Sequence, residues 1–128
     1  MSDKFTVEII SPDQTILKQE TSEVVIPSFE GQMGILNNHI PLITFLRPGI
    51  ITIKAEGEKK YYVEEGTVEF SNNNLLILTS TAKDVDNLDK TQINDLIQKT
   101  EANLNAQSTD KERYVASYKL ETLKEISQ

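Results

Sequence analysis

Hydrophobic and polar positions alternate along the first part of the chain, as they do in half-buried β-strands. In residues 5–10, Phe5, Val7 and Ile9 fall on one side of the expected strand and Thr6, Glu8 and Ile10 on the other. Further strand-like runs cover residues 15–18, 23–26, 50–54, 61–63, 67–70 and 75–80. Short strands repeated at a spacing of roughly 8–12 residues predict a β-sandwich or a β-barrel.

The pattern changes near residue 86. No Gly or Pro occurs from Asn87 onward. Asp89 with Gln92, and Thr109 with Glu112, have the spacing of capping boxes, which mark helix starts. A narrow helical stripe follows the first of them, formed by Ile93, Leu96, Ile97, Thr100 and Leu104. We predict helices over residues 89–106 and 110–126, and the short connection between them favours an antiparallel hairpin.

We therefore divide the chain into a β domain, residues 1–86, and an α-helical hairpin domain, residues 87–128. The chain holds 13 Lys and Arg against 20 Asp and Glu, a net charge of −7. The β domain has 7 basic and 13 acidic residues, a net charge of −6, and the hairpin has 6 and 7, a net charge of −1. Proteins that bind phosphate backbones are usually basic, so we expect no nucleic-acid partner.

Candidate chemistry is sparse along the whole chain. The absence of Cys excludes disulfides, Cys-ligated zinc and thiol nucleophiles, and a single His, His39, excludes multi-His metal sites. The adjacent acids Glu64 and Glu65 would point to opposite faces of a strand. The longest charge-free run, residues 31–46, is too short and too polar to span a bilayer. We predict a non-catalytic protein without metal or cofactor, not inserted in a bilayer, that acts in binding or assembly.

The charge-free stretch around residues 30–44 allows two interpretations. Its apolar side chains lie between two Gly, two Asn and a Pro. In the first interpretation it is an irregular crossover that buries three side chains in the core: Ile40, Leu42 and Ile43. In the second it is a loop that presents three side chains to a partner: Gln32, Met33 and Leu36. Met suits adaptable interfaces, and both interpretations can hold at different residues.

Several short segments resemble the epsilon subunit of F-type ATP synthase. They are Val25-Ile26-Pro27, Glu30-Gly31-Gln32-Met33-Gly34-Ile35-Leu36, His39-Ile40-Pro41-Leu42, Pro48-Gly49-Ile50 and Gly66-Thr67-Val68-Glu69-Phe70. The resemblance extends in length and order over the whole chain. It implies a ten-stranded β-sandwich followed by a C-terminal antiparallel two-helix hairpin. It also implies a non-catalytic central-stalk (rotor) subunit that joins the gamma subunit to the ring of c subunits, through which proton-driven rotation reaches the catalytic head.

The resemblance also implies contact residues. The loop that matches Glu30 to Gly34 faces the c ring in this family, so the candidate c-ring contacts are Glu30, Gln32 and Met33. The family often carries an acid at the position of Gln32, and its absence puts a charge pair there in doubt. The segment that follows lies near gamma and the ring, which makes His39, Pro41, Leu42 and Thr44 candidate interface residues. For His39 we favour an interface or structural role over proton chemistry.

The hairpin matches the family less well. In some members it binds ATP through the motif Ile/Leu-Asp-x-x-Arg-Ala. Here Leu88 and Asp89 are kept, whereas Gln92 and Ile93 replace Arg and Ala. Gln92 cannot offer a guanidinium to phosphate, so we do not expect ATP binding, and we expect Asp89 to serve as a helix N-cap.

In many bacterial members the hairpin extends along gamma and inhibits ATP hydrolysis through basic residues that meet the catalytic subunits. From residue 101 onward the charges nearly cancel, with Lys111, Arg113, Lys119 and Lys124 against Glu101, Asp110, Glu112, Glu121 and Glu125. Such a balance gives little long-range attraction, so we predict weak or absent inhibition. The alternative is a nucleotide-sensing subunit whose hairpin binds ATP or inhibits hydrolysis.

The resemblance implies a place and a set of partners as well. The partners are gamma and the c ring, with the alpha and beta subunits as further partners of the hairpin. No transit peptide is visible, so we expect a peripheral position at the cytoplasmic face of a bacterial inner membrane, with the stromal face of a thylakoid as the alternative.

Overall fold

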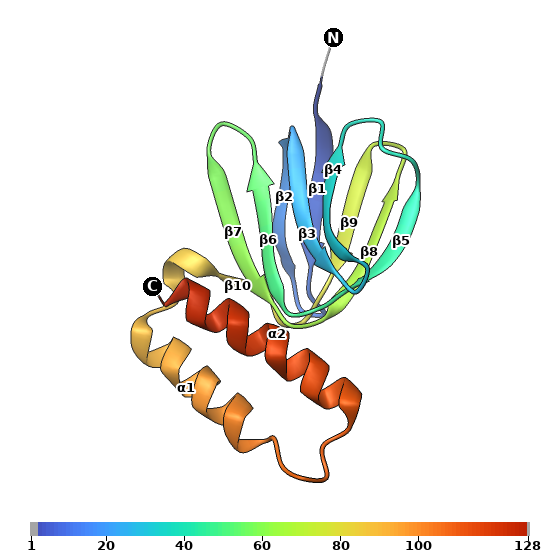
Figure 1. The fold of residues 1–128 in the computed structure, drawn as a ribbon. Helices are drawn as coiled ribbons and strands as arrows, with labels where there is room; N and C mark the ends of the chain where they lie inside the picture. The colour runs from blue at the N-terminus through green and yellow to red at the C-terminus, as the bar shows by residue number, and fades with distance from the viewer. Residues whose placement is uncertain (1–2, 128) are drawn as a thin grey trace.

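A computed structural model describes residues 3–127 as a curled β-sandwich with two helices packed across one end (Figure 1). The strands are β1 Phe5–Ile10, β2 Thr15–Thr21, β3 Glu23–Ser28, β4 Gly31–Leu36, β5 Leu42–Leu46, β6 Gly49–Lys54, β7 Glu58–Val63, β8 Gly66–Ser71, β9 Asn74–Leu78 and β10 Lys83–Asp84. A 3-10 helix, η1 Val85–Asn87, leads into α1 Lys90–Ala102 and α2 Asp110–Ile126.

The ten strands belong to one sheet that curls around its own core. Its order is β10-β7-β6-β3-β5-β8-β9-β1-β2, and β4 pairs with β3 beside this path. The pairing of β1 with β9 is parallel, and the pairing of β8 with its neighbours β5 and β9 is antiparallel. The expected ten-stranded β-sandwich followed by a helical hairpin is thus confirmed.

Alternate residues of the strands form the core, as the periodicity of the sequence predicts. In β1, Phe5, Val7 and Ile9 are buried, whereas the residues between them are half-buried. Buried side chains from these strands pack together in one cluster. Its members are Phe5, Val7, Ile9, Val24, Ile26, Ile35, Leu46, Ile51, Ile53, Tyr61, Val63, Val68, Phe70, Leu75 and Ile77. A continuous apolar core of this kind fixes the register of each strand, because a slip by one residue would turn its apolar side chains outward.

The stretch expected to be an irregular crossover is mostly regular. It forms β4 and β5, joined by residues 37–41. The expectation that Ile40 and Ile43 are buried is wrong, since each is 74% exposed, whereas Leu42 is half-buried and packs against the core. The reason is the pleat of β5, in which Leu42 and alternate residues after it point inward and Ile43 therefore points outward.

Both predicted capping boxes are present. The Asp89 side chain and the Gln92 side chain each bond the other's backbone N–H at the start of α1, and Thr109 and Glu112 do the same at α2. The second helix has the predicted bounds, but the first ends at Ala102 rather than residue 106. In the described part of the chain neither helix is both long enough and apolar enough to cross a membrane.

The early end of α1 follows from side-chain bonds in the connection. The Asn105 side chain accepts a bond from the Gln107 backbone N–H at 2.8 Å, and the Ser108 hydroxyl accepts one from the Asn105 N–H at 2.9 Å. Arg113 of α2 donates to the Asn105 carbonyl at 2.7 Å. Asn and Ser side chains that bond nearby backbone in this way compete with helix formation.

The hairpin lies against the sandwich through a second, smaller cluster. Tyr62 of β7, Ile93 of α1 and Leu123 of α2 are its buried members. The neighbouring Tyr61 points the other way, into the sandwich core. The two tyrosines thus face opposite sides of β7, as a strand requires. The division of the chain into residues 1–86 and 87–128 remains a prediction.

Candidate functional site

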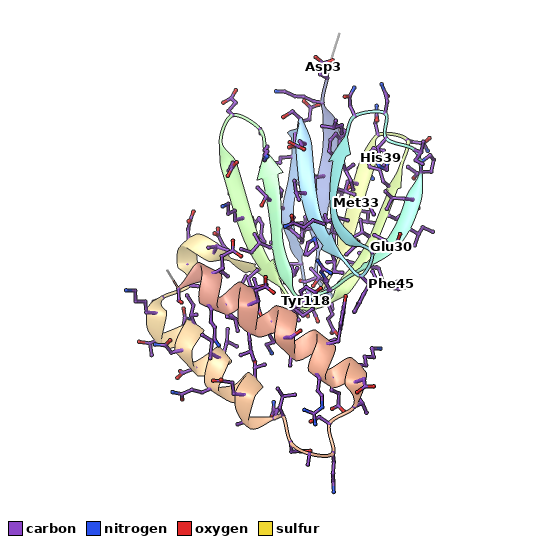
Figure 2. All side chains as sticks on the ribbon, in the orientation of Figure 1. Asp3, Glu30, Met33, His39, Phe45 and Tyr118 are labelled. Carbon is purple, nitrogen blue, oxygen red and sulfur yellow. The ribbon has the colours of Figure 1, made fainter. Side chains whose placement is uncertain are left out.

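The turn between β3 and β4 carries the first set of candidate contacts. Ser28 pairs with Gly31 across the two strands, which leaves Phe29 and Glu30 as a two-residue turn. The Ser28 hydroxyl donates to the Gly31 carbonyl at 2.7 Å and accepts from the Glu30 N–H at 3.2 Å. Gly31 has a φ of +114°, a conformation that favours glycine. These features fix a tight turn that exposes Glu30 at its tip (Figure 2).

The three residues of this set do not share one face. Gln32 is exposed opposite Pro27, whereas Met33 is half-buried and packs against the sandwich core. The Thr44 hydroxyl of β5 donates to the Glu30 carboxylate at 3.3 Å. The structure therefore brings Glu30 and Thr44 together from the two predicted sets, and it leaves Gln32 more accessible than Met33.

His39 lies at the opposite end of β4 from Glu30 (Figure 2). Its backbone N–H donates to the Leu36 carbonyl at 3.2 Å, and its Nδ1 lies 2.7 Å from the Ile40 carbonyl oxygen. The imidazole meets the Phe70 ring edge-on, with ring centroids 5.9 Å apart. Beside it, Pro41 is exposed. These contacts give His39 a structural role in holding the connection between β4 and β5.

A group of exposed apolar side chains lies on the outer face of the sheet, and most of it is not evident from the sequence. We call it the β5 patch, and its members are Ile43 and Phe45 of β5 and Leu78 of β9. Ile43 lies opposite Glu69 of β8, and Phe45 is 59% exposed opposite Thr67. The sequence of residues 42–46 does not show which side chains face outward, because four of the five are large and apolar. The alternation in β8, where Thr67 and Glu69 face outward, is the available signal. Exposed apolar groups of this kind mark interaction surfaces.

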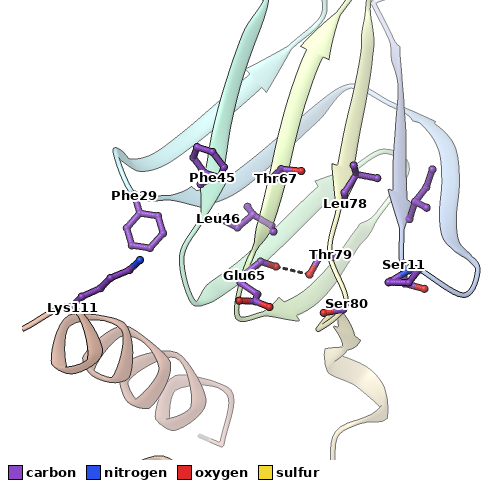
Figure 3. Close-up of a pocket in the computed structure, with 13 residues that line it drawn as sticks. Ser11, Phe29, Phe45, Leu46, Glu65, Thr67, Leu78, Thr79, Ser80 and Lys111 are labelled. Atoms are coloured by element: carbon purple, nitrogen blue, oxygen red, sulfur yellow. Dashed lines mark hydrogen bonds between the residues drawn. The ribbon is translucent and has the colours of Figure 1, made fainter. Parts of the chain in front are cut away.

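An open hollow of about 960 Å³ continues from the β5 patch toward the hairpin (Figure 3). Its apolar lining includes Phe29, Phe45, Leu46 and Leu78. Lys111 reaches it from α2, where the side chain points toward the Phe29 ring (Figure 3). The hollow therefore links the β3–β4 turn, the β5 patch and the first turn of α2.

A polar contact joins α2 to the end of β7. Lys119 pairs with Glu64 at 3.2 Å, and the Tyr62 hydroxyl donates to the same carboxylate at 3.0 Å. Burial raises the pKa of Tyr62 well above its usual range, and the negative charge of Glu64 and its hydrogen bond add to the rise. The Tyr62 hydroxyl is thus kept protonated and bonded beneath the hairpin.

The four positions of the altered ATP motif have structural roles. Asp89 is the N-cap of α1, as predicted, and accepts from the Gln92 N–H at 2.8 Å while Gln92 accepts from the Asp89 N–H at 3.0 Å. Ile93 is buried against Tyr62, and Leu88 packs against the same cluster. Capping and packing therefore account for each of these side chains.

Comparison with known proteins agrees with this architecture. Residues 4–85 match the family model for the ATP synthase, Delta/Epsilon chain, beta-sandwich domain. The chain is 45% identical to the ATP synthase epsilon chain of Pelagibacter ubique (strain HTCC1062) over 130 aligned positions, which cover 99% of this chain and 100% of that one. It is 35% identical to the ATP synthase epsilon chain of Sinorhizobium fredii (strain NBRC 101917 / NGR234), covering 81% and 79% of the two chains.

Solved structures share the fold. A chain of the Euglena gracilis mitochondrial ATP synthase (OSCP/F1/c-ring, rotational state 1) aligns with a TM-score of 0.77 at 20% identity, covering 97% of this chain and 79% of that one. A chain of the Tetrahymena thermophila mitochondrial ATP synthase central stalk and c-ring aligns with a TM-score of 0.70 at 16% identity, covering 96% of each. At such identities the likeness concerns the fold alone.

Proposed function

The chain belongs to the delta/epsilon family of ATP synthase subunits, and we propose that it works in the central stalk, where it joins the gamma subunit to the ring of c subunits. The observation that carries this proposal is 45% identity to an epsilon chain over nearly the whole length of both proteins. The fold shared with a central-stalk structure supports it. In this role the chain catalyses nothing itself; ring rotation passes through it and gamma to the catalytic head.

We assign the c-ring contact to the β3–β4 turn, with the exposed Glu30 and Gln32 as its contact residues and Met33 beside them. Glu30 and Gln32 are exposed, and hydrogen bonds within the turn that carries them keep the turn tight. A rigid, exposed polar turn can meet polar loops of a partner without a large ordering cost.

We assign the contact with gamma to the β5 patch, and we keep His39, Pro41 and Leu42 beside it as candidates for contact with gamma or the ring. Thr44 is buried, so we propose that it supports this surface from within by its bond to Glu30. The support is the exposure of Ile43 and Phe45, since a partner that covers such side chains removes apolar surface from water. The complex then holds the chain peripherally at the cytoplasmic face of a bacterial inner membrane or, in the alternative, at the stromal face of a thylakoid.

Co-purification from its own cell tests the gamma assignment. The wild-type chain is expected to bring gamma with it. The Ile43→Asp variant places a charge in the patch and is expected to weaken the association by about tenfold or more, the effect of losing a central interface contact. The Glu20→Gln variant, at an exposed position of β2 on the far end of the sheet from β5, is the control and is expected to bind normally. A wild-type chain that never associates with gamma would contradict the central-stalk role.

Proton-driven ATP synthesis in membrane vesicles tests the ring contact. Gln32→Ala is expected to lower synthesis more than Met33→Ala, because Gln32 is exposed and Met33 packs inward. If Gln32→Ala, Glu30→Ala and the double variant all synthesise ATP at the wild-type rate, the ring contact lies elsewhere on the chain.

The hairpin is proposed to inhibit ATP hydrolysis weakly or not at all, with gamma and the alpha and beta subunits as its neighbours. Its charges nearly cancel. Deleting residues 88–128 is therefore expected to change hydrolysis by the assembled complex only slightly. A large rise in hydrolysis would favour the alternative, a regulatory subunit whose hairpin senses ATP or inhibits hydrolysis.

A further inference from the structure

Four side chains form a ladder between the β3–β4 turn and α2. The Phe29 ring of the turn is stacked on Tyr114, with centroids 5.8 Å apart and planes 18° apart. Tyr114 meets Tyr118 edge-on at 4.8 Å, and the Arg47 guanidinium lies 4.0 Å above the Tyr118 ring. Tyr114 and Tyr118 are one helical turn apart, so they share one face of α2. The ladder thus joins three separate segments of the chain.

The ladder is tied to the sandwich at both ends. The Arg47 N–H donates to the Pro27 carbonyl at 3.0 Å, which fixes the connection between β5 and β6 beside the end of β3. The Phe29 N–H donates to the Phe45 carbonyl at 3.2 Å. The Arg47 guanidinium also reaches the Tyr114 hydroxyl at 3.5 Å. The stack with Tyr114 therefore covers one face of the Phe29 ring at the tip of the turn.

We propose that Tyr114 is a positioning residue for the β3–β4 turn, so that the docked hairpin holds this turn in the conformation that presents Glu30 and Gln32. The consequence for coupling rests on the proposed function, because the ring contact makes the position of the turn matter. Binding effects are reciprocal: a ring that binds the held turn also favours the docked hairpin. The hairpin then supports coupling from its docked position.

Amide hydrogen exchange of the full chain, followed by NMR, tests the hold on the turn without any partner. In Tyr114→Ala the Phe29 and Glu30 amides are expected to exchange roughly 2–10-fold faster, the size of effect expected for losing one aromatic pair. Tyr114→Phe keeps the ring and loses only the hydroxyl, so exchange is expected to stay near the wild-type rate. The His39 amide, at the far end of β4, is the internal control and should not change.

Two outcomes would overturn the proposal. One is unchanged exchange at Phe29 and Glu30 in Tyr114→Ala, and the other is an equal acceleration at His39, which would mean general loosening. A double-mutant cycle adds a second test, with rates corrected for intrinsic exchange. If the pair acts as one unit, Phe29→Ala combined with Tyr114→Ala speeds Glu30 exchange no more than either change alone. If the acceleration in the double variant equals the product of the accelerations in the two single variants, the two rings act independently.

Vesicles that carry the assembled complex test the consequence. Tyr114→Ala is expected to lower proton-driven synthesis, and Tyr114→Phe to match the wild type. Wild-type synthesis in Tyr114→Ala would overturn the link to coupling. If the wild-type chain fails to assemble with gamma while the turn amides still respond to Tyr114→Ala, the central-stalk role fails and the hold on the turn stands.

Discussion

The sandwich and the hairpin are stabilised in different ways. The sandwich closes around a cluster of 15 buried side chains drawn from its own strands. The hairpin cluster has three buried members, and one of them, Tyr62, is supplied by β7. We therefore expect the sandwich to hold its core without the helices, and we expect the helices to need the sandwich as a surface to pack on.

Two further contacts of the hairpin with the sandwich lie near the surface. The Lys119–Glu64 pair is partly exposed, and so are the Phe29 and Tyr114 rings. Exposed ion pairs contribute roughly 0–1 kcal/mol each. We expect the hairpin to separate from the sandwich at a lower free-energy cost than global unfolding. This difference defines the tests that follow.

The largest effect is expected from Phe70→Ala in the sandwich. Phe70 is fully buried and meets Phe5 edge-on at 5.6 Å. Its truncation is expected to lower the free energy of unfolding by about 3–5 kcal/mol. Urea unfolding should show both regions failing together, because short helices are marginal alone. Phe45→Ala is the matched control, a phenylalanine on the outer face, with an expected change below about 0.5 kcal/mol.

A smaller and more local effect is expected from Leu123→Ala. Leu123 of α2 is fully buried in the cluster that it forms with Tyr62 and Ile93. Truncation of a buried leucine costs about 2–5 kcal/mol, and here we expect the loss in hairpin docking while the sandwich keeps its stability. Circular dichroism would report the melting of the helices, and amide exchange in β1 and β9 would report the stability of the sandwich. Equal destabilisation of β1 would show that the two regions fold as one unit.

The parts of the fold that could be predicted are those encoded locally. The alternation in residues 5–10 needs only neighbouring side chains, and the capping boxes at Asp89 and Thr109 need only three-residue spacing. These features act within one strand or one helical turn. They are therefore visible in the sequence without knowledge of the tertiary structure.

The rest depends on contacts between distant segments. The outward direction of Ile43 and Phe45 follows from the pairing of β5 with β8, which an apolar run cannot reveal. The stack of Phe29 on Tyr114 joins residues far apart in the chain. The resemblance to a family predicts a contact at the turn of Glu30, but it could not reveal that α2 packs against that turn.

Loss of a helix cap is expected to have a still smaller effect, confined to the hairpin. Thr109→Ala removes the hydroxyl that accepts from the Glu112 N–H at 3.1 Å. Such a change costs about 1 kcal/mol. Helicity should melt at a lower temperature while exchange in the sandwich stays unchanged. Thr91→Ala, at an exposed position inside α1, is the matched control. A Thr109→Ala variant with wild-type helicity would mean that docking alone fixes the start of α2.

Tyr62→Phe is expected to have the smallest effect at neutral pH. This effect is also the most specific to the boundary between the sandwich and the hairpin. Burial raises the pKa of the Tyr62 hydroxyl above the value in the unfolded chain, which is about 10. A raised folded-state pKa gives stability that is complete below pH 10 and is lost as the pH rises further. Hairpin docking should therefore weaken above about pH 10 in the wild type.

Tyr62→Phe should remove this dependence, because phenylalanine cannot ionise. The Lys119–Glu64 pair is present in both proteins, so the difference between their helix melting temperatures, measured from pH 8 to pH 11, isolates the Tyr62 hydroxyl. The difference is expected to be small and constant up to about pH 10 and then to change in favour of Tyr62→Phe. Parallel curves over the whole range would mean that docking of the hairpin does not change the pKa of Tyr62, and the hairpin would then not shield this hydroxyl.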